Sequence, residues 1–424
     1  VEANRQVDFG NGRVTNVFGW RQVEHDSLAD IDSTPNPIFH LFAYTDQDQV
    51  SNELRYSGWM RERWEMTVGI YYFTQDIRYR ERRILRGALG QPFGGDQDHS
   101  TGGVFMQHDF DLGGDWVLSL GGRYTLEKKD VRVATAGTGA ACGGERRLCA
   151  FDFEDGDTWR NLTPKIGLQR WFGPGVQVYG YYTRGFRSGG YNLRNTSSTA
   201  SPGPFNEERQ DSFEAGLKSE FANRRIRLNL AAFHNRVYGM QRQVTRADIR
   251  VGGVQVTANT ADATIAGFEL EAAALVGDRL TVNAFLGYTH GEYDKVRYDL
   301  NGDGSTVGDE NLKLPRLAKL SYGADATYEH RLGNLGRLSV RVGLAHRDDS
   351  EITDDNLGVL DGGDILDASI AYSPSDRLSF TLYGKNLLNE VLRRSDFDLS
   401  ALADSTYSPL KEGRVVGFAV RGDF

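Results

Sequence analysis

The chain has 424 residues, a formal net charge of −9 at pH 7 and a hydrophobic share of 39%. No run approaches the roughly 18 apolar residues that a membrane helix needs, so a helical membrane protein is excluded. The negative charge and the lack of a basic stripe exclude a nucleic-acid binder, and apolar residues at strand spacing exclude a disordered chain. Glycine is plentiful, at 50 residues, which is typical of many strands joined by tight turns.

Short and long connections alternate along the chain. Short turns are predicted at 57–62, 112–115, 172–175, 222–224, 276–279, 332–337 and 373–377. Long polar loops are predicted at about 24–48, 76–100, 130–157, 188–206, 241–258, 292–312, 347–363 and 389–411. The connections separate about sixteen antiparallel strands. Up-and-down barrels in outer membranes show the same asymmetry, with short periplasmic turns and long external loops.

Two cysteines, Cys142 and Cys149, lie close together in a glycine-rich stretch. In an oxidising compartment this spacing predicts a local disulfide that pins a loop, and two unpaired thiols are the alternative. The stretch contains no His, so a zinc site lacks further ligands nearby.

The longest clear strand follows the turn at 173–175. Val176, Val178 and Tyr182 fall on one face, while Tyr179 and Tyr181 fall on the other. Strands of soluble proteins usually have about five or six residues. Weak alternation over a longer run, with aromatics near its ends, is typical of a tilted strand that crosses a bilayer.

Later strands repeat this two-faced pattern. The apolar residues of 226–232, 280–289, 320–328 and 378–385 alternate with Ser, Thr, Asn, Asp, Arg or Lys. In a soluble sandwich, the alternative, the apolar face would form the core. Strand length and turn asymmetry favour lipid instead. The predicted fold class is therefore all-β: a transmembrane antiparallel up-and-down β-barrel, with residues 1–424 as a single domain.

A calcium-loop pattern lies in the predicted loop at 292–312. The oxygens would come from Asp299, Asn301, Asp303, the carbonyl of Ser305, and Glu310. Their spacing matches positions one, three, five, seven and twelve of a calcium loop, with Gly304 at the sharp turn. The flanking segments are strands rather than helices, and Asn-Gly-Asp-Gly is also an ordinary turn sequence. Calcium and a plain acidic loop both remain open.

The last strand places Val416, Phe418, Val420 and Gly422 on one face, and the chain ends on Phe424 in the same register. This ending resembles the terminal signal by which outer-membrane barrels are recognised for insertion. It puts the C-terminus in the periplasm and every long loop outside.

Several segments resemble one family, the TonB-dependent outer-membrane receptors. The resemblance is carried by residues 51–56, 66–73, 182–192, 212–219, 266–271, 383–389 and 413–424. The stretch 182–192, YTRGFRSGGYN, is similar to a mid-barrel signature of siderophore-receptor-like members. The matching segments follow the family's order over nearly the whole chain.

The resemblance implies a barrel of roughly 22 strands that encloses an N-terminal plug, with a TonB box before it. Neither plug nor box is found, and Val1 starts in the middle of a pattern without a leader. We therefore expect the chain to be the C-terminal barrel portion of a longer protein. The alternative is a passive porin closed by about sixteen strands.

The implied function is TonB-dependent active uptake of a ferric siderophore or a similar bulky ligand across the Gram-negative outer membrane. The implied partners are TonB with its inner-membrane energising complex, outer-membrane lipid and lipopolysaccharide. Arg184, Arg187, Tyr191 and Arg194 are the candidate ligand-binding residues near the rim, because iron chelates are often anionic with aromatic rings. No nucleophile elbow or phosphate loop occurs, so no enzyme activity and no required cofactor are expected.

Overall fold

The structure is a computed structural model that describes residues 1–32, 34–136, 149–195, 201–246, 254–395, 397–398 and 406–423. Its strands are β1 (Glu2–Val7), β2 (Gly12–Asp30), β3 (Phe39–Arg61), β4 (Trp64–Leu85), β5 (Ala88–Leu89), β6 (Phe93–Gly113), β7 (Trp116–Ala136), β8 (Cys149–Trp171), β9 (Val176–Arg187), β10 (Glu208–Phe221), β11 (Ile226–Arg246), β12 (Val254–Val276), β13 (Leu280–Val296), β14 (Leu320–Arg331), β15 (Arg337–Arg347), β16 (Ser350–Glu351), β17 (Val359–Leu360), β18 (Gly363–Ser375), β19 (Leu378–Lys385), β20 (Phe397–Asp398), β21 (Thr406–Tyr407) and β22 (Val415–Gly422). Four short 3₁₀ turns accompany them: η1 (Phe9–Asn11), η3 (Gly173–Gly175), η4 (Asp309–Asn311) and η5 (Gly333–Leu335). Within the described ranges, no helix has the length and apolar character needed to cross a membrane.

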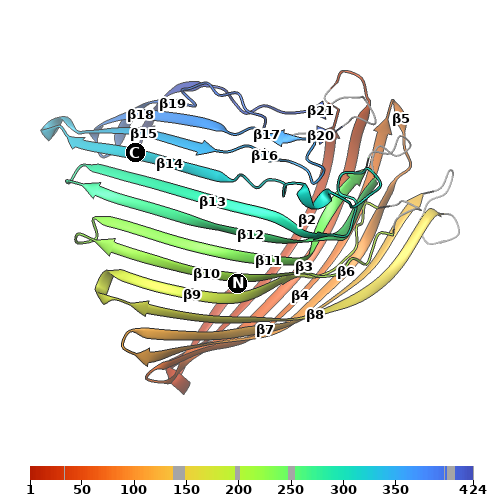
Figure 1. The fold of residues 1–424 in the computed structure, drawn as a ribbon, viewed down its shortest axis with the longest axis horizontal. Coiled ribbons are helices and arrows are strands. Elements are labelled where there is room, and N and C mark those ends of the chain that lie inside the picture. Colours follow the sequence, from red (N-terminus) through yellow and green to blue (C-terminus); the bar gives the residue numbers. More distant parts are fainter. Residues whose placement is uncertain are drawn as a thin grey trace.

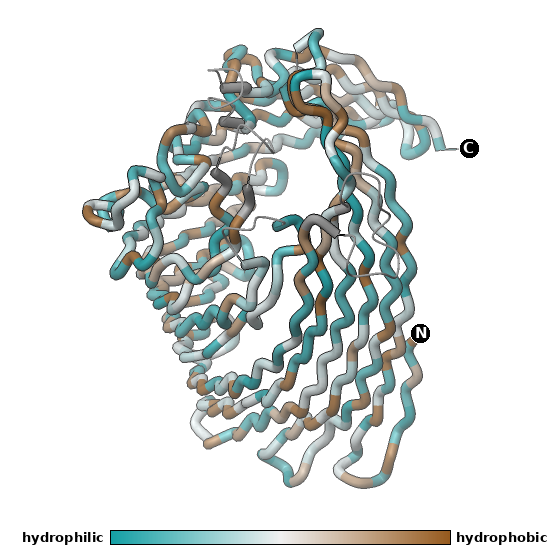
Figure 2. The backbone as a smooth tube through the Cα atoms, turned by 90° about the vertical axis from the view of Figure 1, so that its right-hand side faces the viewer, coloured by the Kyte–Doolittle hydropathy of each residue, from teal (hydrophilic) through white to brown (hydrophobic). Residues whose placement is uncertain are grey.

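One antiparallel sheet of 18 strands forms the wall of the molecule, and β16–β17 and β20–β21 are separate short ribbons. The long strands pair with their neighbours in chain order, which is the up-and-down arrangement that the sequence predicts. The sheet curls around an interior (Figure 2). In the described residues, β1 pairs with β2 alone and β22 with β19 alone. The wall as described is therefore not the closed sixteen-strand barrel of the porin alternative.

The predicted asymmetry of the connections is confirmed. Figure 1 shows tight hairpin turns at the left end of the sheet and longer connections at the right end. The short connections include 62–63, 114–115, 277–279 and 376–377, each inside or beside a predicted turn. At Gly422 the last strand ends opposite Leu378, so the C-terminal end lies on the side of the short turns.

The predicted long loops at 24–48, 76–100, 130–157 and 241–258 are wrong in extent, because much of each is strand. β2 continues to Asp30 and β3 begins at Phe39, while β7 continues to Ala136. A bilayer needs only about 9–11 tilted residues, yet β3 and β8 each have 23. Beyond the bilayer both faces of a strand can be polar, so the alternation that marks a strand disappears while the ladder of hydrogen bonds continues.

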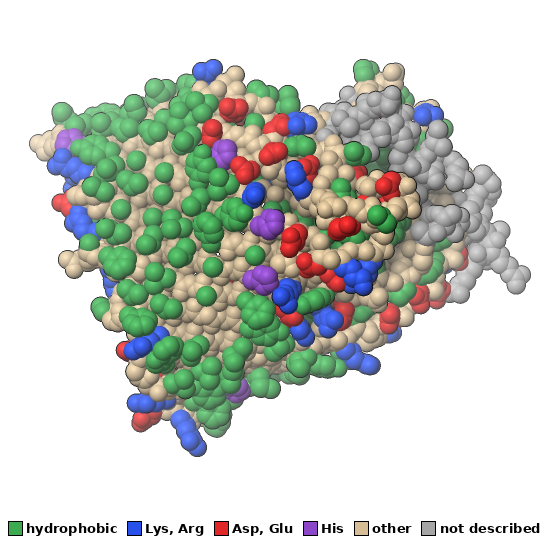
Figure 3. Space-filling model, in the orientation of Figure 1, with side chains coloured by type: hydrophobic (Ala, Val, Ile, Leu, Met, Phe, Trp, Pro, Cys, Tyr) green, Lys and Arg blue, Asp and Glu red, His purple; other side chains and the backbone are tan. Residues whose placement is uncertain are grey.

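An apolar band covers the outer face near the short turns. Figure 3 shows hydrophobic side chains spread over that half of the outer face. Charged side chains line the edge at the short turns, and a larger group of charged and His side chains lies toward the long-loop end. Exposed aliphatic side chains fill the band, among them Leu54, Ile70, Val104, Leu120, Leu162, Val342, Ile370 and Leu382. Exposed aromatics lie at its two edges: Tyr72, Tyr124, Phe213 and Phe268 on one side, and Trp59, Phe172, Phe221 and Tyr328 on the other. Two aromatic girdles around an apolar belt are the mark of a strand wall in a membrane.

Candidate functional site at the long-loop end

The β9–β10 connection folds back against the inner face of the sheet. Its first part, residues 188–195, is called the docked loop here, and Ser188, Tyr191, Asn192 and Asn195 are each at most 9% exposed. Loops are seldom buried, because their backbone polar groups then need partners inside the protein. The partners come from further along the same connection: Gly190 exchanges backbone hydrogen bonds with Phe205, and the Asn192 N–H donates to the carbonyl of Pro202.

Gly189 allows the closest approach in this loop. A Cβ at this position would overlap the carbonyl oxygen of Phe205 and the indole Nε1 of Trp159. The Gln241 side-chain amide donates to the carbonyls of Ser188, at 2.9 Å, and Asn206, at 2.7 Å. The glycine-rich sequence thus packs tightly between β8 and β11.

A buried carboxylate anchors the far end of the docked loop. The Glu81 side chain, on the inner face of β4, is fully buried. Its Oε1 accepts from Arg83 Nε at 2.6 Å, and its Oε2 accepts from Arg194 Nε at 2.6 Å and from the Tyr79 hydroxyl. Burial alone would raise the pKa of Glu81, but the hydrogen bond from Arg194 and the charge of Arg83 outweigh it and lower that pKa. Both guanidinium groups therefore hold an ionised carboxylate.

A second polar group anchors the near end. Lys129 Nζ donates to the Ser188 hydroxyl and to the Gly189 carbonyl, both at 2.7 Å, and lies 2.9 Å from the Glu127 carboxylate. Glu127 also accepts from Ser188 and lies 3.1 Å from His99 Nε2. Lys128 and Asp130 are charged side chains on the outer face of β7, next to Glu127 and Lys129. The polar group at Glu127 and Lys129 therefore lies beyond the apolar band. Burial raises the pKa of Glu127, but the hydrogen bonds from His99 and Ser188 and the ammonium of Lys129 together lower it to about 2.

Apolar packing fixes the middle of the loop. Tyr191 forms a buried cluster with Val131, Val133 and Trp159, which Phe151, Phe153 and Leu193 extend. The Tyr191 hydroxyl donates to Asp155 at 3.2 Å. Burial, and next the charge of Asp155, raise the pKa of Tyr191, so this phenol stays neutral.

A second inward cluster lies under the β13–β14 connection. Val237, Met240, Ala261, Ala263 and Tyr293 of the strands pack against Leu300 and Leu314 of the connection. The Tyr293 hydroxyl donates to Asp354 at 2.7 Å, which ties this cluster to the β15–β18 connection. The long-loop end is therefore partly filled from within by packed chain on two sides.

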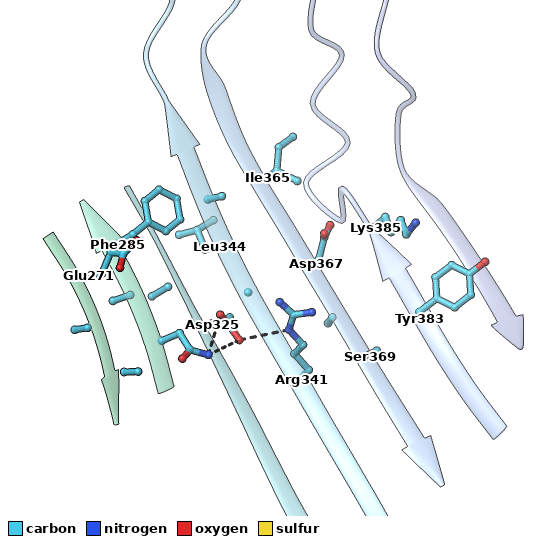
Figure 4. Close-up of a pocket in the computed structure, with 18 of the residues that line it drawn as sticks. Glu271, Phe285, Asp325, Arg341, Leu344, Ile365, Asp367, Ser369, Tyr383 and Lys385 are labelled. Carbon is cyan, nitrogen blue, oxygen red and sulfur yellow. Dashed lines mark hydrogen bonds and ion pairs between the residues drawn. The ribbon is translucent and has the colours of Figure 1, made fainter. Parts of the chain in front are cut away.

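Toward the short turns, the inner wall is polar and hollowed. A hollow of about 530 Å³ lies over β11–β15, β18 and β19 (Figure 4). Charged residues of both signs line it: Arg227, Glu271, Asp325, Arg341, Asp367 and Lys385. Asp325 lies 3.4 Å from Arg341 Nε and accepts from the Asn283 amide at 3.4 Å. Such a wall suits water or a packed polar protein surface, and not lipid.

The four predicted ligand-binding residues are not all brought together. Arg187, Tyr191 and Arg194 lie inward at the docked loop. Arg184 pairs in register with Asp211, next to the outward-facing pair of Tyr182 and Phe213. It donates to Asp211 through Nε at 2.7 Å and through a second nitrogen at 2.8 Å, so it faces away from the interior.

Arg187 keeps the most exposed side chain of the inward three, at 57%. One of its terminal nitrogens donates to the Gln241 carbonyl at 2.9 Å and lies 3.3 Å from Glu208. Sequence reasoning missed Glu81, Lys129 and Trp159, which hold the docked loop. Lys129 lies 59 positions from Ser188, and Glu81 lies 113 positions from Arg194. Local sequence patterns do not report contacts over such separations.

The predicted calcium residues lie in one connection. Both oxygens of Asp299 accept backbone N–H groups, from Gly302 at 2.6 Å and Gly304 at 2.9 Å, and Glu310 accepts from Gly308 at 3.1 Å. Asn301 and Asp303 cap the next turns in the same way. In the described ranges, the group of three His, Asp or Glu side chains whose ligand atoms lie within 4.8 Å of one another is found elsewhere, at Asp30, Asp32 and His40. Calcium stays a prediction.

The predicted disulfide also stays a prediction. Cys142 lies outside the described residues, and Cys149 is the first residue of β8.

Comparison with known proteins identifies the family. The family model described as "TonB dependent receptor-like, beta-barrel" matches residues 2–387. The metal-pseudopaline receptor CntO of Pseudomonas aeruginosa (strain UCBPP-PA14) is 24% identical over 261 residues, which are 59% of this chain and 32% of that protein. The chain thus spans about a third of the length of this relative.

Solved structures share the fold. The ferric yersiniabactin uptake receptor FyuA of Yersinia pestis matches with a TM-score of 0.82 at 17% identity, over 100% of this chain and 60% of that one. The ferric-catecholate import receptor Fiu of E. coli K12 matches with a TM-score of 0.71 at 15% identity, over 97% of this chain and 62% of that one. The family is one of receptors and not of enzymes, in agreement with the sequence prediction. The chain belongs to the TonB-dependent receptor family, in the part that forms its β-barrel.

Proposed function

We propose that the full-length protein is an outer-membrane receptor that takes up a metal complex of the ferric-siderophore class, energised through TonB. The observation that carries this proposal is the family match across residues 2–387. The apolar outer band and the polar inner wall support it, because a receptor of this kind needs lipid outside and water or protein within.

The ligand class is suggested by the related proteins. One receptor is named for metal-pseudopaline, one for ferric yersiniabactin and one for ferric catecholates. All three names describe a metal held by an organic chelator. The proposed cargo is therefore an iron chelate or a chelate of a similar metal.

The proposed partners follow from the same function. A plug domain from outside this sequence would pack on the charged inner wall, and TonB with its inner-membrane complex would act on the plug. Lipid and lipopolysaccharide would cover the outer band. Further strands would join β1 and β22 and so remove the two open edges, whose unpaired backbone groups are costly in hydrocarbon.

We assign the ligand-facing role to Arg187 first. Its guanidinium is exposed and inward, whereas Tyr191 and Arg194 are engaged in holding the docked loop. Arg184 faces outward and would act only by bracing the strand against Asp211.

Uptake measurements test this function. Cells that express the full-length receptor should accumulate ⁵⁵Fe from a panel of ferric siderophores, and cells that lack the gene should not. Loss of TonB, or a protonophore, should abolish the uptake. Uptake that persists without TonB would point to the passive channel instead.

Labelling in intact cells tests the proposed orientation. In a Cys142→Ser, Cys149→Ser background, Thr306→Cys would place a thiol on the exposed β13–β14 connection, and Asn334→Cys would place one on the exposed β14–β15 turn. A membrane-impermeant maleimide should label the first and spare the second until the outer membrane is opened. The reverse labelling pattern would contradict the proposed orientation and place the short turns outside.

A further inference from the structure

The tip of the β2–β3 hairpin brings together one imidazole and two carboxylates. Asp30, at the end of β2, pairs in register with His40, at the start of β3. Asp32 follows two residues later, in the connection between the two strands. His40 Nε2 lies 3.7 Å from an oxygen of Asp30 and 3.9 Å from an oxygen of Asp32. These are the three side chains whose ligand atoms lie within 4.8 Å of one another.

The His40 ring nitrogen is buried without a hydrogen bond. Both carboxylate oxygens lie beyond hydrogen-bond distance, and Nε2 has no partner among the described residues. Leaving a buried polar atom unsatisfied is costly, and such an atom in a folded protein calls for a water or an ion that completes it. This nitrogen lies within 4 Å of an oxygen of each of the two carboxylates, so a cation placed among the three groups would contact all of them.

The buried carboxylate is held in position by its own hydrogen bonds. The Asp32 side chain is only 1% exposed. Its Oδ1 accepts from the Thr34 hydroxyl and N–H, and its Oδ2 accepts from the Phe39 N–H at 2.5 Å. A carboxylate oxygen has a second lone pair, so Asp32 can still bind a metal while these donors orient it.

The spacing fits a small transition-metal ion. With metal–ligand bonds of about 2.0–2.2 Å, neighbouring ligand atoms in a tetrahedral site lie about 3.3–3.6 Å apart. The two distances from His40 Nε2 exceed this by only a few tenths of an ångström, which a side-chain rotation can close. Imidazole with two carboxylates is a ligand set for Zn²⁺, Co²⁺ or Ni²⁺, whereas calcium prefers oxygen alone.

We propose that Asp30, Asp32 and His40 bind a divalent first-row transition metal, of which Zn²⁺ is the natural occupant, with solvent in the remaining position. The ion joins the end of β2 to the start of β3 and pins the hairpin tip at the long-loop end of the wall. The tip also bonds to the next connection, where the N–H groups of Arg86 and Gly87 donate to the carbonyls of Ile38 and Pro37, at 2.8 Å each. This site does not depend on which ligand, if any, the receptor transports.

Metal binding to the purified protein tests the site directly. The full-length receptor, prepared in detergent without a polyhistidine tag and stripped with EDTA, is dialysed against Zn²⁺ in the presence of excess Ca²⁺. The wild type should bind Zn²⁺ at this site, and His40→Gln and Asp32→Asn should each weaken that binding by at least about tenfold. Co²⁺ substituted for Zn²⁺ should give the visible absorption of a four-coordinate site in the wild type, and the band should be lost in both variants.

A matched control separates the site from general effects. His25 lies on the same hairpin, is exposed and pairs in register with Thr45, so His25→Gln removes an imidazole without touching the cluster. It should bind Zn²⁺ like the wild type. Unchanged Zn²⁺ affinity in His40→Gln and Asp32→Asn would overturn the proposal, and so would equal displacement of Zn²⁺ by Ca²⁺. Circular dichroism of each variant confirms that the barrel is folded, so a loss of binding reports the site and not the fold.

Discussion

Arg194 donates its Nε–H to Glu81 at 2.6 Å and so joins the β9–β10 connection to β4 across 113 positions of sequence. Arg194 is 31% exposed, but the Glu81 side chain is fully buried. The docked loop is thus tied to the inner wall by a charge pair at one end and by the Lys129 contacts at the other. The docked loop is therefore part of a packed surface at the long-loop end.

Replacing the buried carboxylate should release the loop. Glu81→Gln leaves the charges of Arg83 and Arg194 without their partner, and breaking one side of a buried pair costs about 3–5 kcal/mol. Hydrogen exchange at the amides of residues 188–195 should accelerate accordingly. Glu53→Gln is the control, because its partner Arg55 is 42% exposed and the pair should contribute little. Equal protection of the loop amides in wild type and Glu81→Gln would contradict the role of Glu81 in anchoring the loop.

The same carboxylate should make the loop sensitive to acid. Because Arg194 and Arg83 lower the pKa of Glu81 against the opposite effect of burial, its ionisation stabilises the fold above its ordinary value of 4.5. This stabilisation is lost as the pH falls from 4.5 toward the lowered value. The melting temperatures of wild type and Glu81→Gln should therefore differ at neutral pH and converge below pH 4.5. A gap that stays constant through this range would show that Glu81 is not ionised.

A single methyl group should disturb the tightest point of the loop. In Gly189→Ala the new Cβ overlaps Phe205 and Trp159, and overpacking of this kind costs about 1–3 kcal/mol. Gly185→Ala is the matched control on the same segment, since no atom lies within 4 Å of its Cβ position. Thermal unfolding in detergent should show a lower midpoint for the first variant and an unchanged one for the second. Equal midpoints would show that the loop accommodates the added methyl group without loss of stability.

The strands of the wall could be predicted from the sequence because the patterns that mark strands and turns are local. Alternation with period two marks each face of strands such as 280–289, and Gly, Asn and Asp mark the turns. The same parity places Arg184 on the face of Val178 and Tyr182, away from Arg187, so its outward position was within reach of the sequence. The contacts of the docked loop could not be predicted. Glu81 lies on β4 and Arg194 in the β9–β10 connection, and no local sequence pattern links them.

Calcium should stabilise the β13–β14 connection if the predicted loop binds it. Asp299→Ala removes the first oxygen ligand, and a thermal scan with Ca²⁺ and with chelator should then give the same midpoint, whereas the wild type should gain stability with Ca²⁺. Asp299 also accepts the N–H groups of Gly302 and Gly304, so its loss can change stability without any metal. The test is therefore the difference between the midpoints with Ca²⁺ and with chelator, measured separately for each protein. No difference between Ca²⁺ and chelator in the wild type would leave a plain acidic loop.

A charged side chain in the middle of the apolar band should lower the stability of the protein. Val342 lies outward on β15, 46% exposed, between Val340 and Leu344. An Arg at the bilayer midplane of a strand wall costs about 2–4 kcal/mol, because its guanidinium loses water without gaining a partner. Ser339→Arg is the control, since the same charge on the inner face, opposite Glu329, stays in a polar environment. Denaturant unfolding of the full-length receptor from phospholipid vesicles should show the loss of stability for Val342→Arg alone. Equal losses in the two variants would mean that the outward face does not lie in lipid.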